Sequence, residues 1–460
     1  MQPTLDKIVS LCKRRGFIFP SSEIYGGLAN VYDFGPYGVA LKNNIRDSWW
    51  SHFVNKREDI VGIESQILMH PKVWEASGHV SSFADPLVED TVSKKRYRAD
   101  HLIEAYAKKK GIEVDPDSMS LDEIDSFIRE NKILSPDGNA LSGAKSFNLL
   151  FETQLGVITG EKNTAYLRAE TAQGMFVMFK SILESTRVKI PFGIAQIGKV
   201  FRNEVTLGKF IFRTLEFEQM EIQYFIREAD WEKFFALWEN AMEVWYIDIL
   251  GLKREKIDWK AHTKLAHYAK KAQDLRYAFD WGLDEISGLH YRTDFDLSTH
   301  AKYSGKKLEI TDNSTGETFV PHDVEATFGL SRSVLAVLYE AYHEETLENG
   351  SERVVMKFPS HLAPIQVAVF PLQKDDKLVE LAREIYGQLL NLGLRVEFDN
   401  AGNIGKMYRR QDEIGTPFCV TVDFDSLNDQ MVTIRSRDKM TQERIAIKDV
   451  STYLTKGNGK

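Results

Sequence analysis

The chain has 460 residues, of which 43% are hydrophobic and 27% are charged, and its formal net charge at pH 7 is −8. This composition is typical of a globular protein with sizeable cores, and a size of about 150 residues per domain predicts two to four domains. The sequence contains no run of about 18 apolar residues, so a membrane span is not predicted. The negative net charge excludes a surface that is basic all over, but it does not exclude a local basic surface for nucleic acid.

The N-terminus and the cysteines indicate a reducing compartment. Charged residues interrupt the apolar positions of "MQPTLDKIVSLCKRRGF", so a secretory signal is not predicted. Cys12 and Cys419 stand far apart and form no CxxC pair, which excludes a cysteine-based zinc site. We therefore expect a cytoplasmic protein.

The first 350 residues alternate helical and strand-like runs without a regular βαβ rhythm. Within them, residues 100–135 are polar and have the pattern of helices. They predict an insertion, over about 86–160, on the surface of a larger sheet.

The stretch "FRNEVTLGKFIFRTLEFEQMEIQYF" is unusual because many charged residues stand among aromatic ones. With the strand period of two, Arg202 and Glu204 share one face, and so do Arg213, Phe217 and Glu221. Two adjacent strands would then present arginines, carboxylates and an aromatic ring at one place. Arginine forks suit phosphate oxygens, and a ring can stack on a flat base. A surface hairpin with cross-strand ion pairs explains the same pattern, so both interpretations stay open.

The C-terminal part has a different pattern. The run "SRSVLAVLYEAYHEETLENG" predicts a helix that ends at Asn349-Gly350. From about residue 360, "IQVAVFPL", "LRVEFDN", "TPFCVTVDF" and "DQMVTIRSRD" read as strands, and helical runs separate them. This alternation predicts a small α/β domain with crossover connections and a boundary near residue 355.

The usual phosphate-binding and hydrolytic motifs are absent from the sequence. It has no GxxxxGK[ST] loop, no GxGxxG unit that opens a helix, no HExxH and no GxSxG elbow. His262 and His267 lie five residues apart, which is poor spacing for one helical face, and we expect both to be structural. If the protein is an enzyme, its chemistry depends on arginines and carboxylates.

At this point the sequence resembles a known family. F-R-x-E, a loop and then R-x-x-x-F-x-Q-x-E is similar to motif 2 (201–225) of class II aminoacyl-tRNA synthetases. "GPYGVALKNNIRDSWW" and the strand that follows resemble motif 1 (35–71), and "EATFGLSRSVLAVLYEAY" resembles motif 3 (325–342). Further stretches, among them "LRAETAQGMF", "RTDFDLSTH" and "VEFDNAGNIGKMYRRQDEIG", are similar to homodimeric glycyl-tRNA synthetases over nearly the whole chain.

The resemblance implies a mixed α/β (α+β) fold. A class II catalytic domain with an antiparallel sheet and flanking helices would span 1–355, and an anticodon-binding domain would span 356–460. Motif 1 would form a homodimer interface. The implied reaction joins glycine to ATP, giving glycyl-adenylate and pyrophosphate, and then transfers glycine to the 3′ end of glycine tRNA with release of AMP.

The resemblance also implies roles for individual residues, and the first of these concern ATP. Arg202 would hold the α-phosphate, Glu204 would read the adenine amine and Phe217 would stack on adenine. Arg213 and Arg332 would bind the outer phosphates, with Arg202 and Arg332 as the catalytic pair. Mg²⁺ would bridge the phosphates, and Glu309 in "KLEITD" is the candidate ligand for it.

For glycine, the resemblance implies a pocket of carboxylates and a hydroxyl around the ammonium group. The matching residues are Glu170, Glu221, Glu325 and Thr327, while Arg292 would bind the substrate carboxylate. For tRNA, the candidate contacts are Arg98 in "KKRYR" and, in the C-terminal domain, Arg409, Arg410, Arg435 and Arg437. Because "EDTVSKKRYRADH" lacks the cysteines that some members have, we expect no zinc.

The sequence departs from the family pattern at several places. Ala169 replaces a usual Pro, Thr327 a usual Ser, and Met407 a usual basic residue; the loop "TLGKF" lacks a common Pro-Arg pair. Two other functions would use the same fold: a catalytically inactive accessory protein, or a ligase that adenylates another small acid. The joint presence of the motif 2 and motif 3 arginines favours an enzyme, and the three glutamates favour an α-ammonium substrate.

Overall fold

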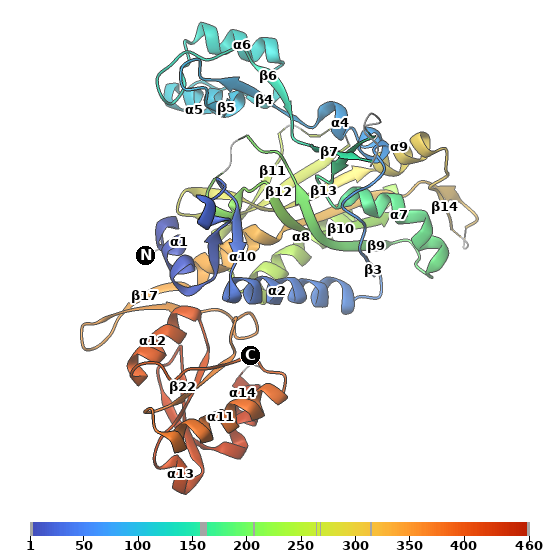
Figure 1. Ribbon diagram of the computed structural model, residues 1–460. Helices are drawn as coiled ribbons and strands as arrows, with labels where there is room; N and C mark the ends of the chain where they lie inside the picture. The colour runs from blue at the N-terminus through green and yellow to red at the C-terminus, as the bar shows by residue number, and fades with distance from the viewer. Residues whose placement is uncertain are drawn as a thin grey trace.

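A seven-stranded sheet forms the centre of the molecule (Figure 1). The computed structural model describes residues 3–156, 163–205, 208–263, 265–266, 268–312 and 315–457. Strand neighbours in this sheet are antiparallel except for the parallel pair β3–β9. In spatial order the strands are β11 (Ile257–Ala261), β12 (Lys271–Phe279), β13 (Gly282–Thr293), β16 (His322–Gly329), β10 (Glu216–Ile226), β9 (Phe192–Phe201) and β3 (Ile60–Ile63).

The two faces of this sheet have different surroundings. Alternate residues such as Ile222 and Phe328 join the main core, which also contains side chains of the helices α2 (Pro36–Trp50), α8 (Trp231–Val244) and α10 (Leu330–Ala341). On the opposite face, α7 (Ala172–Ser185) and α9 (Phe295–Ser304) form a smaller core around Phe225. These helices leave part of that face open. The predicted antiparallel sheet with flanking helices is confirmed.

Shorter elements complete the N-terminal part. The long helix α2 and the strand β3 coincide with the stretch that resembles motif 1. The other elements are α1 (Leu5–Arg15), β1 (Ile18–Pro20), η1 (Glu23–Tyr25), β2 (Tyr32–Phe34), η2 (Ser51–Asn55), α3 (Lys72–Ala76), α4 (His79–Ser82), η4 (Phe210–Phe212), η5 (Glu228–Asp230), η6 (Trp245–Ile249), η7 (Arg254–Lys256), β14 (Ile310–Thr311) and β15 (Thr318–Phe319).

The predicted insertion projects from the main body and has a core of its own (Figure 1). Its helices confirm the helical pattern of residues 100–135, and a capping box between Ser120 and Glu123 begins the second of them. It consists of β4 (Ala84–Glu89), β5 (Arg96–Arg98), α5 (Ala99–Lys110), η3 (Pro116–Ser118), α6 (Leu121–Glu130) and β6 (Lys145–Asn148), and the hairpin of β7 (Phe151–Leu155) and β8 (Asn163–Leu167) follows.

The helix predicted to end at Asn349-Gly350 is shorter than expected. Helix α10 ends at Ala341, and the chain continues as an antiparallel hairpin of β17 (Tyr342–Thr346) and β18 (Glu352–Met356). Gly350 has φ +76° in the turn between these strands, so the Asn-Gly pair marks a hairpin turn and not a helix end. The predicted boundary near residue 355 falls within β18.

The C-terminal unit is the predicted small α/β structure. Its sheet has the order β20-β19-β21-β22-β23, and β19 is parallel to both of its neighbours. The strands and helices that the sequence predicts are all present. The elements are β19 (Val367–Pro371), α11 (Asp376–Asn391), β20 (Val396–Phe398), α12 (Ile404–Ile414), β21 (Phe418–Val422), α13 (Ser426–Asp429), β22 (Met431–Ser436), β23 (Gln442–Ala446), η8 (Ile447–Asp449) and α14 (Val450–Gly457).

A buried ion cluster joins this unit to the β17–β18 hairpin. Asp412 on α12 accepts hydrogen bonds from Arg353 of β18 at 2.8 Å and from both terminal nitrogens of Arg435 at 2.9 and 3.1 Å. Arg437 is also buried and donates to the main-chain oxygens of Met356 and Phe358. Arg435 and Arg437 therefore hold the unit together, and the structure does not support their predicted contact with RNA, because their guanidinium groups are buried and occupied.

Arg409 and Arg410 are less enclosed than these two. Arg409 donates to the main-chain oxygen of Glu352, and Arg410 pairs with Asp399. Both therefore have partners within the chain, and their contact with RNA stays a prediction.

The Asp412 cluster predicts a large stability effect. The substitution Asp412→Asn leaves the buried charges of Arg353 and Arg435 without their shared anion, and breaking a buried pair in this way costs about 3–5 kcal/mol. Hydrogen exchange of the amides in β19 and β21 should show a loss of protection of that size. The control Glu184→Gln, in an exposed pair with Lys180, should change stability by no more than about 0.5 kcal/mol. Equal protection in both variants would contradict the role of the cluster.

Candidate active site

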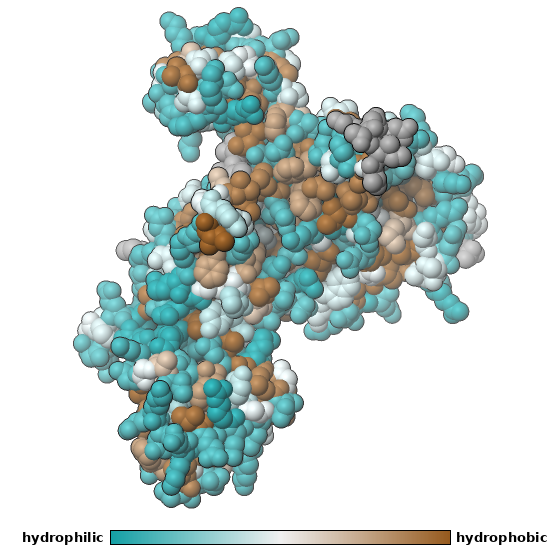
Figure 2. Space-filling view, in the orientation of Figure 1, coloured by the Kyte–Doolittle hydropathy of each residue, from teal (hydrophilic) through white to brown (hydrophobic). Residues whose placement is uncertain are grey.

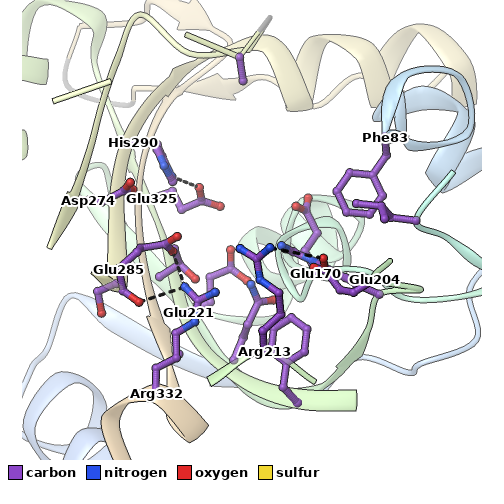
Figure 3. A pocket seen from close by; sticks show the side chains of 18 of the residues that line it. Phe83, Glu170, Glu204, Arg213, Glu221, Asp274, Glu285, His290, Glu325 and Arg332 are labelled. Carbon is purple, nitrogen blue, oxygen red and sulfur yellow. Dashed lines mark hydrogen bonds and ion pairs between the residues drawn. The ribbon is translucent and has the colours of Figure 1, made fainter. Parts of the chain in front are cut away.

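A cavity of about 580 Å³ opens on the face of the central sheet that the helices leave uncovered (Figure 3). This volume lies in the range of pockets for small molecules and cofactors. Side chains of β10, β12, β13 and β16 line it, together with the segment after β9, the α4 region and Arg98 of the insertion.

Most of the site residues predicted from the sequence meet in this cavity. The predicted residues of motifs 2 and 3 line it, and so do Arg98, Glu170 and Arg292, whereas Glu309, Arg409, Arg410 and Arg435 do not. Those that line it are Arg98, Glu170, Arg202, Glu204, Arg213, Phe217, Glu221, Arg292, Glu325, Thr327 and Arg332.

The alternation along β10 explains the charged strand of the sequence. Phe217 and Glu221 line the cavity, whereas Met220 and Ile222, on the other face of the strand, are buried in the main core. Across the strand pair, Glu221 stands opposite Thr327 of β16, so one face collects the polar side chains. The predicted shared face is therefore confirmed for the two residues that lie within β10.

The other residues of this stretch reach the cavity in a different way. Arg213 precedes β10, and Arg202 and Glu204 follow the end of β9. All three are placed by the connection between the two strands and not by strand periodicity. Two residues of the "TLGKF" loop, Thr206 and Leu207, lie outside the described residues, so the structure does not test the predicted effect of that departure.

Three carboxylates, of which Glu221 and Glu325 are buried and Glu170 is partly buried, stand together at one end of the cavity. The side-chain amide of Gln223 links two of them, because its Nε2 lies 3.2 Å from Glu221 Oε1 and 2.9 Å from Glu325 Oε1. The third, Glu170, has its Oε2 3.5 Å from His79 Nε2 and accepts a hydrogen bond from Gln173 Nε2 at 2.8 Å. This arrangement brings negative charges close together with little water to screen them.

The surroundings separate the pKa values of these carboxylates. Burial raises the pKa of Glu221 well above its ordinary value, and the charge of Glu325 raises it further. Burial also opposes ionisation of Glu325, but Arg292 and His290 outweigh it and hold the pKa of Glu325 well below its ordinary value. In the same way, His79 and Arg292 outweigh burial at Glu170 and lower its pKa to about 2. Of the three carboxylates, Glu221 therefore holds a proton most readily, whereas the surroundings of Glu170 and Glu325 favour their ionised forms.

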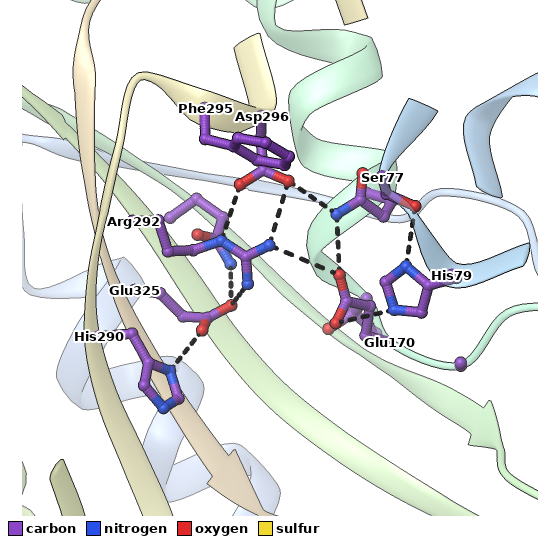
Figure 4. A network of polar contacts seen from close by, with 12 residues as sticks. Ser77, His79, Glu170, His290, Arg292, Phe295, Asp296 and Glu325 are labelled. Carbon is purple, nitrogen blue, oxygen red and sulfur yellow. Dashed lines mark hydrogen bonds and ion pairs between the residues drawn. The ribbon is translucent and has the colours of Figure 1, made fainter. Parts of the chain in front are cut away.

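Arg292 is the buried cation of this cluster (Figure 4). Its guanidinium donates to Asp296 at 2.8 and 3.0 Å and to Glu325 at 2.9 Å, and one nitrogen lies 3.8 Å from Glu170. The ring of Tyr268 packs against it, with 4.0 Å between the guanidinium carbon and the ring centroid. Arg292 thus holds carboxylates of the protein, and a substrate carboxylate would have to share it with them.

The other end of the cavity carries arginines and an aromatic ring. Arg332 pairs with Glu285 at 3.0 Å and donates to the main-chain oxygen of Phe212 at 3.2 Å. Arg202 donates to the main-chain oxygen of Ala169 at 3.1 Å, and its guanidinium carbon lies 5.5 Å from the ring centroid of Phe217. These contacts use only part of each guanidinium fork, which has five N–H donors.

Arg213 and Arg98 complete the charged lining. Arg213 Nη1 lies 3.9 Å from Glu204 Oε2. Arg98 pairs with Asp85 at 3.0 Å and with Asp100, so the residue predicted to contact tRNA faces the cavity from the insertion. Burial raises the pKa of Asp85 to about 6 although Arg98 opposes the shift.

Glu309 is not supported as a ligand of a phosphate-bound metal ion. It lies just before the short strand β14, is exposed, and pairs with Lys307 at 2.9 Å. One side chain that the sequence does not indicate is Glu285, which lines the cavity beside Arg332.

A β-bulge explains why strand periodicity does not reveal Glu285. The register between β12 and β13 shifts at Leu275/Arg276, so that Arg276 pairs with Glu285 and Leu275 with Ser287. The extra residue, Ile286, is buried in the core. Glu285 therefore lies on the cavity face together with Arg292, although seven positions separate the two in sequence.

His262 and His290 also line the cavity, although the sequence predicted only a structural role for His262 and no role for His290. His262 pairs with Asp274 at 2.8 Å, and His290 lies 2.6 Å from Glu325. His267 lies outside the described residues. No sequence spacing connects His262, Asp274 and His290, because they come from different strands or strand ends.

Two family models match the chain. The model "tRNA synthetase class II core domain (G, H, P, S and T)" matches residues 155–342, and "Anticodon binding domain" matches residues 366–457. Glycine–tRNA ligase of Caldanaerobacter subterraneus is 49% identical, over 98% of both chains. Those of Geobacillus thermodenitrificans and Chlorobaculum tepidum are 46% and 45% identical, over at least 98% of each chain. The chain belongs to the glycine–tRNA ligase family.

The fold of this chain is similar to that of a solved structure with low sequence identity. Prolyl-tRNA synthetase from Cryptosporidium parvum, complexed with halofuginone and AMPPNP, matches with a TM-score of 0.65 and 14% identity, over 99% of this chain and 77% of that chain. The expected class II fold with an anticodon-binding unit is confirmed. Among the described residues, no helix is long and apolar enough to cross a membrane.

The raised pKa of Glu221 predicts a pH-dependent stability cost. Folding favours the protonated form of Glu221. The cost in unfolding free energy is therefore absent at low pH, where Glu221 is protonated in both the folded and the unfolded state, and it grows as the pH rises above the ordinary pKa of a glutamate. Thermal unfolding from about pH 5 to about pH 8 should therefore show Glu221→Gln gaining stability relative to the wild type as the pH rises. The exposed control Glu184→Gln should run parallel to the wild type. A constant difference between Glu221→Gln and the wild type would contradict the assignment of the proton.

Proposed function

We propose that this chain catalyses ATP-dependent attachment of glycine to glycine tRNA. The reaction has two steps: glycine and ATP give glycyl-adenylate and pyrophosphate, and glycine is then transferred to the 3′ end of the tRNA with release of AMP. The observation that carries the proposal is one cavity with a carboxylate end for an ammonium group and an arginine end for phosphates.

The carboxylate end suits the α-ammonium group of glycine. Glu170 and Glu325 are anions, and loss of the proton on Glu221 would add a third when a cation arrives. Thr327 adds a hydroxyl on the same face. A larger amino acid is rejected by collision with the pocket wall, which is easier than rejecting a smaller one, so selection of glycine requires no editing domain.

Arg292 is a positioning residue in this proposal. Its bonds to Asp296 and Glu325 hold the carboxylates in place and use three of its five N–H groups, so a substrate carboxylate could take at most the other two without displacing them. This role differs from the primary carboxylate receptor that the family resemblance implies.

The arginine end suits ATP. The carboxylate of glycine is already an anion, so the first step needs no general base and depends on positioning and on neutralisation of phosphate charge. Arg202, Arg213 and Arg332 would bind phosphate oxygens. Phe217 would stack on adenine, and Glu204 would accept a hydrogen bond from the adenine amine.

A Mg²⁺ ion bound with ATP would need oxygen ligands at the arginine end. Glu285 fits this requirement, because its side chain lies in the cavity, is 45% exposed and stands beside Arg332. Mg²⁺ would supply further neutralisation of the phosphates, and Glu285 replaces Glu309 as the candidate ligand.

The remaining partners follow from the family and from surfaces outside the cavity. The C-terminal unit would bind the anticodon, with Arg409 and Arg410 as candidate contacts. A homodimer is supported by Ile24, Tyr25 and Leu28, which are 89%, 87% and 61% exposed near motif 1. Figure 2 shows more apolar surface over the middle of the molecule than over the insertion and the C-terminal unit. A cytoplasmic location stays a prediction.

The arginine end predicts a catalytic defect that the exchange of pyrophosphate into ATP can measure. Arg202→Ala and Arg332→Ala should each lower glycine-dependent exchange by about 10²–10³-fold, as loss of one preorganised charge donor does elsewhere. The control Arg129→Ala, on the exposed side of α6 in the insertion, should retain exchange.

The choice of amino acid tests the carboxylate end in the same assay. Exchange should depend on glycine and not on other amino acids. No exchange with any amino acid, from a folded protein that binds RNA, would contradict the proposed enzyme and favour an accessory RNA-binding protein.

A further inference from the structure

A second polar cluster lies in the cavity next to the carboxylates. His262 follows β11, and its backbone N–H donates to the oxygen of Ala272 on β12 at 3.0 Å. Ala272 pairs with His290 of β13, and Asp274 pairs with Gly288. The sheet register therefore brings His262, Asp274 and His290 together from three neighbouring strands, and all three line the cavity.

The distances within this cluster are close to those of a metal site. One ligand atom from each of the three residues lies within 4.8 Å of the others, and His262 Nε2 is 2.8 Å from Asp274 Oδ1. In a tetrahedral zinc site with bonds of about 2.0–2.1 Å, neighbouring ligand atoms are about 3.3 Å apart. Metal binding would therefore draw the most widely separated ligand atoms together by up to about 1.5 Å. Within the described ranges, no other three such residues gather this closely.

A carboxylate outside the cluster orients one of the histidines. His290 Nδ1 lies 2.6 Å from Glu325 Oε2 (Figure 4). In the tautomer in which Nδ1–H donates to Glu325, the lone pair of the imidazole ring is on Nε2. Carboxylate–histidine pairs of this kind fix the tautomer and raise the basicity of a metal-binding histidine.

The backbone of β13 at Gly288 packs against the imidazole ring of His290. A Cβ atom at Gly288 would lie 2.8 Å from His290 Cε1 and 3.3 Å from His290 Nε2. The ring therefore packs directly over Gly288, the residue that pairs with Asp274 across the strands. Glycine at this position lets the histidine lie close to the sheet, on the side of the other two ligands.

We propose that His262, Asp274 and His290 bind one divalent transition-metal ion, with Zn²⁺ as the preferred class. Two imidazoles and one carboxylate favour zinc, cobalt or nickel over Mg²⁺, which prefers oxygen ligands. Three protein ligands leave a coordination position open, and it faces the cavity because all three ligands line it. The absence of cysteine ligands, from which the sequence indicated no zinc, does not bear on a site of this composition.

The metal site would be linked to the glycine end through one side chain. His290 would bind the metal ion through Nε2, while its Nδ1 stays hydrogen-bonded to Glu325. The ion would therefore fix the orientation of the Glu325 carboxylate. This link to substrate binding rests on the proposed function, whereas metal binding itself does not.

Cobalt binding tests the site directly. The full chain without a polyhistidine tag, freed of metal by a chelator, is titrated with Co²⁺ alone, and the visible absorption bands of tetrahedral or five-coordinate cobalt are followed. We expect saturation at one ion per chain and displacement by Zn²⁺. His290→Gln and Asp274→Asn should lose this saturable binding, and Glu325→Gln should weaken it by about 10–100-fold.

Two further variants guard against misfolding and nonspecific binding. His70→Gln, at an exposed histidine outside the cavity, should bind Co²⁺ like the wild type. Gly288→Ala removes no ligand but pushes the His290 ring, so it should bind more weakly. Circular dichroism checks that each variant is folded.

The proposal is overturned if the wild type shows no saturable binding, or if folded His290→Gln and Asp274→Asn bind as the wild type does. The titration contains no glycine, ATP or tRNA. Its failure would therefore leave the result of the pyrophosphate exchange assay, and with it the proposed function, unaffected.

Discussion

The buried guanidinium of Arg292 is the constraint on which the site depends. Glu325, Asp296 and Glu170 approach it closely in a region with little water, where the repulsion between them would otherwise be severe. One cation does not balance all the carboxylates of the cluster, and burial together with the neighbouring negative charge raises the pKa of Glu221, which favours its protonated form. The site is thus preset to accept one more positive charge.

The sheet makes this arrangement possible because its two faces are chemically separate. On β10 and β16 the residues of one parity, such as Ile222 and Ala326, pack against the helices, and those of the other parity, such as Glu221 and Glu325, line the cavity. The helix-covered face provides the apolar burial that stabilises the sheet, so the open face can carry charges. Rigid strands then hold the ammonium end and the phosphate end at a fixed separation.

The sequence predicts those parts of the structure that follow from local periodicity or from motif resemblance. The alternation of β10 and the α/β pattern after residue 360 are of the first kind, and the meeting of Arg202, Glu221 and Glu325 is of the second. Features that arise from tertiary contacts were missed. Arg435 looked like a surface charge, but it is buried against Asp412 from another element.

Register and turn chemistry account for other misses. Glu285 reaches the cavity because of a bulge, which shifts the face of every residue beyond it and leaves no periodic signal. An Asn-Gly pair such as Asn349-Gly350 occurs both in hairpin turns and at helix ends. Only the pairing of β17 with β18 shows that here it forms a hairpin turn. The cluster of His262, Asp274 and His290 joins separate strands, so no spacing in the sequence indicates it.

Proton release on glycine binding tests the central claim most directly. Calorimetric titrations of glycine, in the presence of a nonhydrolysable ATP analogue and in buffers of different ionisation enthalpy, give the number of protons exchanged at about pH 7. If the ammonium of glycine replaces the proton on Glu221, the wild type releases protons on binding and Glu221→Gln does not. Binding without proton release in the wild type would contradict the account.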